Sequence, residues 1–269
     1  MRPRVSVIVP WCNRKNIGHA VARNGPALER SDAELIIVNF GGDGAMLVDL
    51  LGDPTPPWLR ILAIDTPSFN KCCAQNLGVK ASRGEILFFI DEDIVLEDDT
   101  LEEVVTTVSE GGCFATIERV EESEPVPRFS LYLDSVTMMV GFRSHNGQSV
   151  TVETNTSFLS EGARGGPGLA CLTKADFLEI GGMNSMIHGR GWSDIDLIAR
   201  LQFALNSTRK KLGRATHFSH STCEPWEFDD RVRSQSEPLN YQRCLRNYSA
   251  GRFQGSFSTD IERWLDSVI

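Results

Sequence analysis

Three acidic residues, Asp91, Glu92 and Asp93, directly follow the apolar run 86–90. Carboxylates this close together repel one another unless a cation lies among them, and hard divalent ions such as Mg²⁺ or Mn²⁺ prefer oxygen ligands of this kind. In an extended chain, the side chains of Asp91 and Asp93 point to one side and that of Glu92 points to the other. The cluster therefore predicts a divalent metal with an attached phosphate, and an acidic surface turn is the alternative explanation.

Two further groups of residues could carry chemistry. Asp194 and Asp196 lie where a helix is expected to start, and Ser193 precedes Asp196 by three residues, as in a capping box. His217 and His220 lie at the end of a segment where a strand is expected. A neutral imidazole can complete a metal shell that is otherwise made of oxygen, which favours manganese. Both groups also have structural explanations, because acidic residues are favoured in the first turn of a helix and isolated histidines are commonly structural.

A sheet is needed to position the acidic cluster, and the first hundred residues have the pattern of one. Short runs rich in β-branched residues alternate with helix-compatible segments, which is typical of a parallel, doubly wound α/β sheet. These runs cover 5–9, 35–38, 61–64 and 86–90. Ligands bind at the carboxyl ends of the strands in such sheets, so the cluster is expected at the ligand-binding edge. Further strands are expected at 113–118, 137–142, 149–153 and 213–218.

Helical periodicity and capping signals mark five segments. They are 70–81, from Asp99 to Gly111, from Thr173 to Gly181, from Ser193 to Leu205, and 260–268. Asp99 and Thr173 are placed to cap their helices, and paired glycines follow both of these segments. The stretch 121–127 is acidic and contains proline, so we expect an exposed connection there. We find no internal repeat and no linker that divides the chain into two domains.

Composition limits the class of protein. The 269 residues are 41% hydrophobic and 23% charged, which is typical of a globular protein with a full core. The net charge of -9 argues against general binding to nucleic acids or anionic membranes. Seven cysteines, with Cys72 and Cys73 adjacent and no C-x-x-C pair, indicate reduced thiols. Neither a signal peptide nor an apolar run of membrane-spanning length is recognised, so the expected location is the cytoplasm.

The motifs of the second half resemble those of a known family. A Gly-Gly turn, a helix led by Thr-Lys, a Gly-Gly-x-Asn turn and the run Gly-Trp-Ser-Asp-Ile-Asp-Leu follow one another over 165–197. They resemble the acceptor-side half of GT-A glycosyltransferases, both in family 2 and in the galactosyltransferase C-terminal region. The segments 5–14 and 70–84 resemble the opening strand with its nucleotide loop and the helix before the D-x-D motif. The resemblance covers roughly residues 4–220.

This resemblance implies a fold and a reaction. The fold is expected to be GT-A, a Rossmann-like and mostly parallel sheet flanked by helices. The single domain would cover 1–222, with a nucleotide-sugar half at about 1–112 and an acceptor half at about 113–222. A C-terminal extension would cover 223–269. The reaction would be a metal-dependent, inverting transfer of a sugar from a nucleotide-sugar donor, expected to be UDP-linked, to an acceptor.

The resemblance also implies roles for individual residues. Asp194 would be the general base that takes the acceptor's proton. Asp91 and Asp93 would hold the ribose and a divalent metal, Mn²⁺ or Mg²⁺, on the diphosphate. His217, or alternatively His220, would be a further metal ligand. The acceptor side would include Gly166, Trp192, Ser193 and Asp196.

Donor binding would draw on several segments. Besides Asp91 and Asp93, the residues expected there are Pro10, Trp11, Asn13, Arg14, Asn39, Asp43, Asn70, Lys71 and Glu92. Trp11 has two alternatives, stacking on the base or a place in the core. Arg14 could reach a phosphate.

Two positions depart from the family's pattern. Asn39-Phe40 stands where the family usually has two acidic residues, the first of which contacts the uracil ring. The nucleotide preference is therefore open, with Asp43 as a substitute contact. Ser193 stands where the family often has a glutamate that holds hydroxyl groups, which leaves donor and acceptor preference open.

Other functions stay open beside the glycosyltransferase. A sugar-phosphate nucleotidyltransferase would share the sheet and the acidic pair, but it should open with a Gly-rich basic loop, which 9–14 is not. A degenerate member would bind a sugar nucleotide or a partner without turnover. The acceptor is not defined by the sequence. The polar segment 223–269 either covers the acceptor cleft or makes a homo-oligomer contact.

Overall fold

The computed structural model describes residues 2–97, 99–124, 133–219 and 230–268. The strands are β1 (Val5–Trp11), β2 (Ala33–Phe40), β3 (Leu59–Ile64), β4 (Ile86–Phe89), β5 (Ile94–Leu96), β6 (Cys113–Glu122), β7 (Ser135–Arg143), β8 (Ser149–Phe158), β9 (Ala163–Thr173) and β10 (Thr208–His217). The helices are α1 (Ile17–Arg30), α2 (Gly44–Leu51), α3 (Lys71–Ala81), α4 (Thr100–Ser109), α5 (Lys174–Glu179), α6 (Ser193–Leu205), α7 (Asp230–Ser249) and α8 (Phe257–Val268).

One mixed sheet joins all the described strands. Its order is β3-β2-β1-β4-β9-β6-β10-β5, and the β7–β8 hairpin joins it through β8 and β9. Strands β1 to β4 are parallel, as the sequence predicts. The second half differs, because β9 runs antiparallel to β4, β6 and β8. The connection from β8 to β9 is short, and a short connection can join only antiparallel neighbours.

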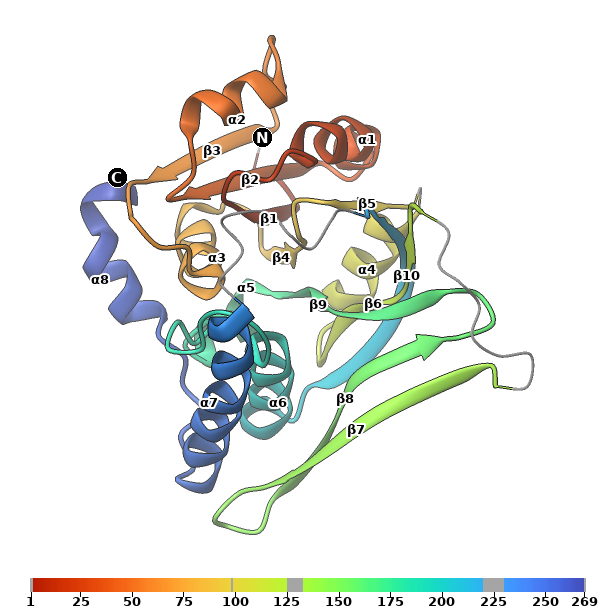
Figure 1. The fold of residues 1–269 in the computed structure, drawn as a ribbon, viewed down its shortest axis with the longest axis vertical. Helices are drawn as coiled ribbons and strands as arrows, with labels where there is room; N and C mark the ends of the chain where they lie inside the picture. Colours follow the sequence, from red (N-terminus) through yellow and green to blue (C-terminus); the bar gives the residue numbers. More distant parts are fainter. Residues whose placement is uncertain (1, 98, 125–132, 220–229, 269) are drawn as a thin grey trace.

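Helices cover both faces of the sheet and enclose two hydrophobic cores (Figure 1). Along β1, Val7 and Val9 belong to the core shared with α1 and α4, while Ile8 belongs to the core shared with α3 and α6. Burial on both faces explains why the early strands are continuous apolar runs. The predicted α/β class with helices on both faces is confirmed.

Helix α3 lies unusually close to the sheet at Gly78. A Cβ atom there would lie 2.6 Å from Cγ2 of Ile8 and 3.0 Å from Cγ2 of Val38. The missing side chain lets the helix settle on β1 and β2, and its first residue, Lys71, therefore lies at the carboxyl edge of these strands. Asn70 caps the helix by accepting a hydrogen bond from the backbone N–H of Cys73.

Of the three expected helix caps, one is present and two are not. Thr173 caps α5 by accepting a hydrogen bond from the N–H of Asp176. Asp99 occupies the cap position of α4, but its side chain makes no capping bond. The predicted capping box at the start of α6 is wrong. Trp192 is the cap residue there, in a left-handed conformation with φ of 73°, and Ser193 is already the first helical residue.

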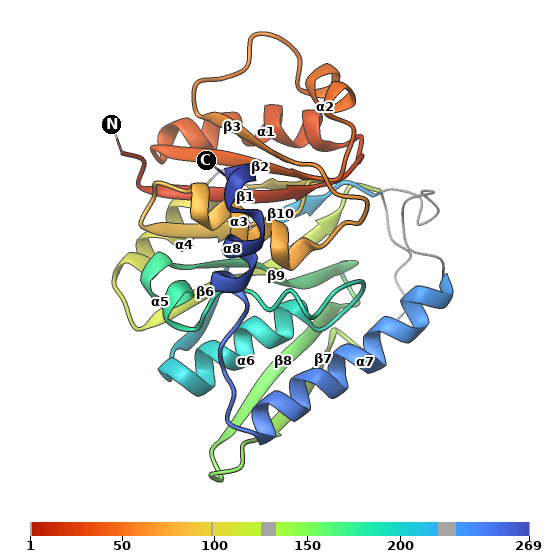
Figure 2. The same cartoon turned by 90° about the vertical axis from the view of Figure 1, so that its left-hand side faces the viewer.

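The last fifty residues contain more helix than the sequence predicts. Helix α8 begins at Phe257, close to the expected start, and packs on α3 (Figure 2). Helix α7 was not expected, because its sequence is polar and contains Pro238, with little amphipathic periodicity. Buried side chains hold it in place, among them Cys244 and Tyr248. None of the described helices is both long enough and apolar enough to span a bilayer.

The predicted exposed connection at 121–127 is also partly wrong. Strand β6 continues through Glu121 and Glu122, because β10 pairs with it along its whole length. The remainder of that stretch beyond residue 124 lies outside the described residues. Strands β7 and β8 extend as a long hairpin away from the centre of the sheet, in the lower part of Figure 1.

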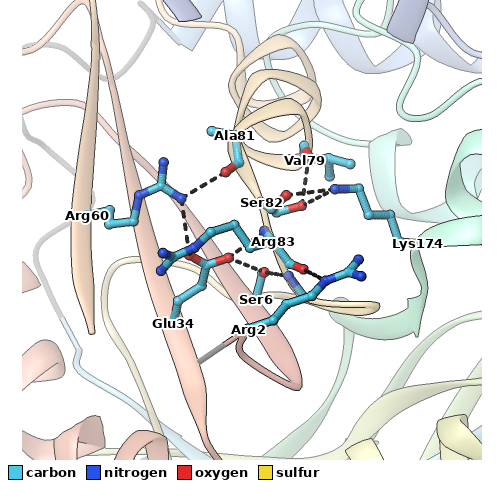
Figure 3. A network of polar contacts seen from close by, with 10 residues as sticks. Arg2, Ser6, Glu34, Arg60, Val79, Ala81, Ser82, Arg83 and Lys174 are labelled. Atoms are coloured by element: carbon cyan, nitrogen blue, oxygen red, sulfur yellow. Dashed lines mark hydrogen bonds and ion pairs between the residues drawn. The ribbon is translucent and has the colours of Figure 1, made fainter. Parts of the chain in front are cut away.

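A buried carboxylate links the amino-terminal ends of neighbouring strands. Glu34, near the start of β2, accepts hydrogen bonds from Ser6 at 2.7 Å and from the N–H of Arg83 at 2.6 Å (Figure 3). The guanidinium groups of Arg60 and Arg83 lie 3.1 and 2.9 Å away. Burial opposes the charged form of Glu34, but these hydrogen bonds outweigh it and hold its pKa below the ordinary 4.5. This network closes the amino-terminal edge, so the carboxyl edge is left for ligands.

Candidate active site

The acidic cluster forms the turn between β4 and β5. Asp93 is only 6% exposed, and its backbone carbonyl accepts a hydrogen bond from the N–H of Phe218. Strand β5 pairs with β10 and brings Ile94 opposite His217. As a result, Nε2 of His217 lies 3.3 Å from Oδ2 of Asp93. Two of the residues predicted as metal ligands, Asp93 and His217, therefore lie next to each other. His220, the other candidate, lies outside the described residues.

A second carboxylate, Glu122, contacts the other side of His217. Its Oε2 lies 2.6 Å from Nδ1 of the ring. Burial disfavours the charged imidazole, but Asp93 and Glu122 outweigh it and raise the pKa of His217 to about 9. Sequence reasoning missed Glu122, because only the parallel register of β6 and β10 places it opposite His217.

Asp93 and His217 have the chemistry of a manganese site. They offer one carboxylate oxygen and one imidazole nitrogen at the edge of the sheet, and a diphosphate and water can supply the other ligands. Within the described residues, no three His, Cys, Asp or Glu side chains are arranged to hold a metal by themselves. Asp91, the other predicted ligand, differs: its Oδ1 forms an ion pair with Lys71 at 2.7 Å.

Lys71 connects the acidic turn with the acceptor side. Burial lowers the pKa of its ammonium group, but the carboxylates of Asp91 and Asp194 outweigh burial and raise that pKa above its ordinary value. Two predicted site residues that are about a hundred positions apart in the sequence therefore act on the same cation. Lys71 therefore links the acidic turn after β4 with the first turn of α6.

Glu92 points to the arginine of the first loop. Its Oε1 lies 3.4 Å from Nε of Arg14. Burial, followed by repulsion from Asp93 and Asp91, raises the pKa of Glu92 to about 8. The three neighbouring carboxylates thus have separate partners: Lys71 for Asp91, Arg14 for Glu92, and His217 for Asp93.

The remaining donor-side residues hold the loops above the sheet. Trp11 is 0% exposed and donates from its indole N–H to the carbonyl of Arg14, so of its two alternatives it takes the core position. Asn13 accepts from the N–H of Asp43 at 2.6 Å and joins the first two loops. Asn39 accepts from the N–H of Gly42.

Three other predicted donor residues also have structural partners. Asp43 caps α2 by accepting from Ala45 and Met46. Asn70, besides capping α3, donates to the carbonyl of Ser185 at 2.9 Å. Pro10 is buried in β1. These contacts give the loops a defined shape at the edge where a nucleotide would bind.

Asp194 lies in the first turn of α6, against the backbone of β9. A Cβ atom on Gly168 would lie 2.7 Å from Oδ2 of Asp194, so any larger residue there would displace this carboxylate. The hydroxyl of Ser193 donates to Oδ1 of Asp194 at 3.3 Å. Gly166, predicted on the acceptor side, lies against the sheet, where a Cβ atom would meet Val120 and Ile117.

Asp196 does not face an acceptor. It is 1% exposed and accepts from Nε of Arg200 at 2.7 Å and from the hydroxyl of Tyr248 at 2.9 Å. Arg200 also donates to the carbonyls of Ile180 and Gly182. Instead of the expected acceptor binding or capping, Asp196 forms a buried ion pair with Arg200 within α6, and its hydrogen bond with Tyr248 attaches α6 to α7.

Helix α7 also secures the loop that leads to Asp194. The side-chain amide of Asn240 donates to the carbonyls of His188 at 3.0 Å and of Gly191 at 3.2 Å. The Trp192 ring packs on Tyr241, with 4.7 Å between the ring centres. Tyr241 is 40% exposed, so an aromatic surface stays open beside the start of α6.

Comparison with known families gives two matches that follow one another along the chain. The model described as "Glycosyl transferase family 2" matches residues 6–156. The model described as "N-terminal domain of galactosyltransferase" matches residues 150–221. Both matches confirm the resemblance inferred from the sequence motifs. Helices α7 and α8 lie beyond the matched regions.

Solved structures give the same fold. The chain is similar to GalNAc-T7 in complex with UDP, GalNAc and Mn²⁺, with a TM-score of 0.62 and 14% identity over 91% of this chain and 48% of that one. It is also similar to the mannosyltransferase PcManGT from Pyrobaculum calidifontis in complex with GDP-Man and Mn²⁺, with a TM-score of 0.55 and 16% identity over 99% of this chain and 69% of that one. The chain therefore spans about half the length of the first of these structures.

Proposed function

Because the chain belongs to glycosyl transferase family 2, we propose that it transfers a sugar from a nucleotide-sugar donor, UDP-linked, to an acceptor with inversion at the anomeric carbon. The observation that carries this proposal is the position of Lys71, whose ammonium group forms an ion pair with Asp91 at 2.7 Å and whose charge is also stabilised by Asp194. This supports a single reaction centre between the acidic turn after β4 and the first turn of α6.

Asp93 and His217 are the residues that would hold a divalent metal, Mn²⁺ or Mg²⁺. Bound there, the ion would supply Lewis-acid stabilisation of the leaving diphosphate. Lys71 and Arg14 add positive charge next to the same turn, and each now faces a carboxylate, Asp91 and Glu92 respectively. A nucleotide diphosphate in that place would attract both cations, which an otherwise acidic protein needs for binding it.

Asp194 is the proposed general base. Its carboxylate lies against the β9 backbone at Gly168, which leaves little freedom of position. It would accept the proton of the acceptor's hydroxyl as that oxygen attacks the anomeric carbon from the side opposite the leaving diphosphate. The proton moves to Asp194, the new glycosidic bond forms, and the bond from the sugar to the diphosphate breaks.

Calorimetric titration with UDP, with and without Mn²⁺, tests the donor side of this proposal. The proposal is supported if UDP binding requires Mn²⁺ and is lost in Asp93→Asn. It is contradicted if UDP binds equally well with and without Mn²⁺. A screen of nucleotide sugars for Mn²⁺-dependent hydrolysis then identifies the donor.

The base and the stereochemistry have separate tests. Asp194→Asn should bind UDP as the unmodified protein does but lose hydrolysis and transfer, with Asp176→Asn on α5 as the control. Full turnover by Asp194→Asn would show that Asp194 is not the general base. A retained anomeric configuration in the product, read by NMR, would contradict inversion. If the unmodified protein binds the donor but shows no turnover, the chain is better explained as a sugar-nucleotide-binding protein than as an enzyme.

A further inference from the structure

Three neighbouring strands place Glu122, His217 and Asp93 in one row. In the parallel pair of β6 and β10, His217 is directly opposite Glu122. In the antiparallel pair of β10 and β5, His217 is opposite Ile94, the residue after Asp93. The backbone reinforces this arrangement, because Ser123 N–H donates to the carbonyl of His217 at 2.9 Å. The row is therefore a property of the sheet itself.

Both ring nitrogens of His217 are engaged. Nδ1 lies 2.6 Å from Oε2 of Glu122, and Nε2 lies 3.3 Å from Oδ2 of Asp93. With the ring held at Nδ1, only Nε2 is directed at the acidic turn. The orientation of the imidazole is thus defined from the side that faces away from Asp93.

Glu122 is itself held by further groups. The hydroxyl of Ser219 donates to its Oε2 at 3.1 Å, and Nε of Arg164 lies 3.4 Å from its Oε1. These contacts come from the segment after β10 and from β9 respectively. A carboxylate with such supports has a fixed position and can fix its own partner in turn.

We propose that Glu122 is a positioning residue for the metal site: it accepts the Nδ1–H of His217 and so presents Nε2 to a divalent ion shared with Asp93. This inference rests on the proposed function, since it assumes that the ion binds at Asp93 and His217. Carboxylates that accept a hydrogen bond from a metal-bound histidine fix its tautomer and strengthen it as a ligand, and their loss typically weakens metal binding by about 10–100-fold.

Two other roles for Glu122 predict different results. As a direct metal ligand, it would be as sensitive to loss of its charge as Asp93 is. As a purely structural residue, it would affect the stability of the fold and leave metal affinity unchanged. Glutamine separates these roles, because its amide oxygen can still accept the Nδ1–H bond but carries no charge.

The experiment is a titration of the whole protein with Mn²⁺ in the presence of UDP, followed by the electron paramagnetic resonance signal of the free ion. We expect Glu122→Ala to weaken Mn²⁺ binding about 10–100-fold, and Glu122→Gln to recover most of that loss. Asp93→Asn should weaken binding more than either. Glu121→Gln is the matched control, because the neighbouring Glu121 forms its ion pair with Arg214 instead.

Each result has a defined meaning. Unchanged Mn²⁺ affinity in Glu122→Ala overturns the inference while leaving the proposed function intact. A loss in Glu122→Gln as large as that in Asp93→Asn also overturns it, in favour of direct ligation. Failure of the unmodified protein to bind Mn²⁺ overturns the proposed metal site and this inference with it. If Glu122→Ala does not fold, as judged by its melting curve, the comparison of Glu122→Gln with Asp93→Asn still decides between positioning and direct ligation.

Discussion

The ammonium nitrogen of Lys71 lies 2.7 Å from Oδ1 of Asp91. A lysine therefore neutralises the first carboxylate of the D-x-D turn, and the second aspartate, Asp93, lies 3.3 Å from the imidazole of His217 on β10. The sequence suggests that Asp91 and Asp93, on the same side of the chain, share one cation. In the structure each of them has a separate partner. The loss of Lys71 should consequently affect the diphosphate more than the metal.

We expect Lys71→Met to weaken UDP binding about 10–100-fold, because a charge-assisted hydrogen bond contributes about 1.5–3 kcal/mol. Isothermal titration in saturating Mn²⁺ measures this. Lys80→Met, an exposed lysine at the far end of the same helix, is the matched control. Equal UDP affinity in both variants would show that Lys71 serves only to neutralise Asp91.

Gly168→Ala should impair turnover without affecting the donor. The added Cβ would lie 2.7 Å from Oδ2 of Asp194 and must displace this carboxylate. A displacement of about 1 Å can cost on the order of 100-fold in rate, so we expect a drop in kcat of about 10–100-fold with unchanged UDP affinity.

The control for this change lies on the same strand. The Cβ atom added in Gly165→Ala would lie 3.7 Å from its nearest neighbour, an ordinary van der Waals distance. This variant should therefore keep full turnover. Steady-state rates with the donor found by the hydrolysis screen provide the measurement. Equal rates for the two alanine variants would argue against a catalytic role for Asp194.

Asn240→Ala should loosen the loop before α6. Its amide hydrogens bond the carbonyls of His188, Arg190 and Gly191, and alanine leaves these three acceptors without that partner. Hydrogen exchange over 186–192 should speed up, while exchange in β1 stays slow. Gln242→Ala, an exposed position on the same helix, should leave the loop unchanged. Unchanged, slow exchange over 186–192 in Asn240→Ala would show that other contacts are enough to hold this loop.

Glu34 should make the fold sensitive to acid. Its pKa is lowered in the folded protein, so the stability it contributes is fully present above the unfolded value of about 4.5 and is lost as pH falls through the lower folded value. Glu34→Gln should cost about 1–3 kcal/mol at neutral pH, since it weakens hydrogen bonds to a buried carboxylate.

Urea unfolding at several pH values checks this prediction. The difference in free energy of unfolding between the unmodified protein and Glu34→Gln should shrink below pH 4.5. Glu85→Gln is the control, because Glu85 lies near the same network but is mostly exposed and pairs with the exposed Arg2. A difference that stays constant with pH would show that the Glu34 charge does not contribute.

The sequence predicts the parallel half of the fold, and some residues that it singles out, such as Asp93 and His217, lie together in the structure. Buried β-branched runs identify β1 to β4, and the order of the chain places Asp93 at the edge. Glu122 could not be found this way, because its role depends on strand register across the mixed half of the sheet.

Other misses have the same origin in tertiary contacts. Helix α7 lacks an amphipathic pattern, and its position is set by bonds to α6 and the preceding loop. Asp196 stands in the first turn of a helix, where a cap is the local expectation, but Arg200 and Tyr248 bury it. Local sequence signals cannot distinguish a carboxylate that faces a ligand from one that faces the interior.

The loop before α6 is held by helix α7, which is synthesised after it. The segments that carry Asp93, Asp194 and His217 leave the ribosome before the helix that holds the loop in front of α6. A growing chain can therefore assemble its sheet and still lack the anchor for that loop. That loop is secured only after residues 230–249 have been made, so a chain that stops before α7 lacks the hydrogen bonds from Asn240 to the loop before Asp194.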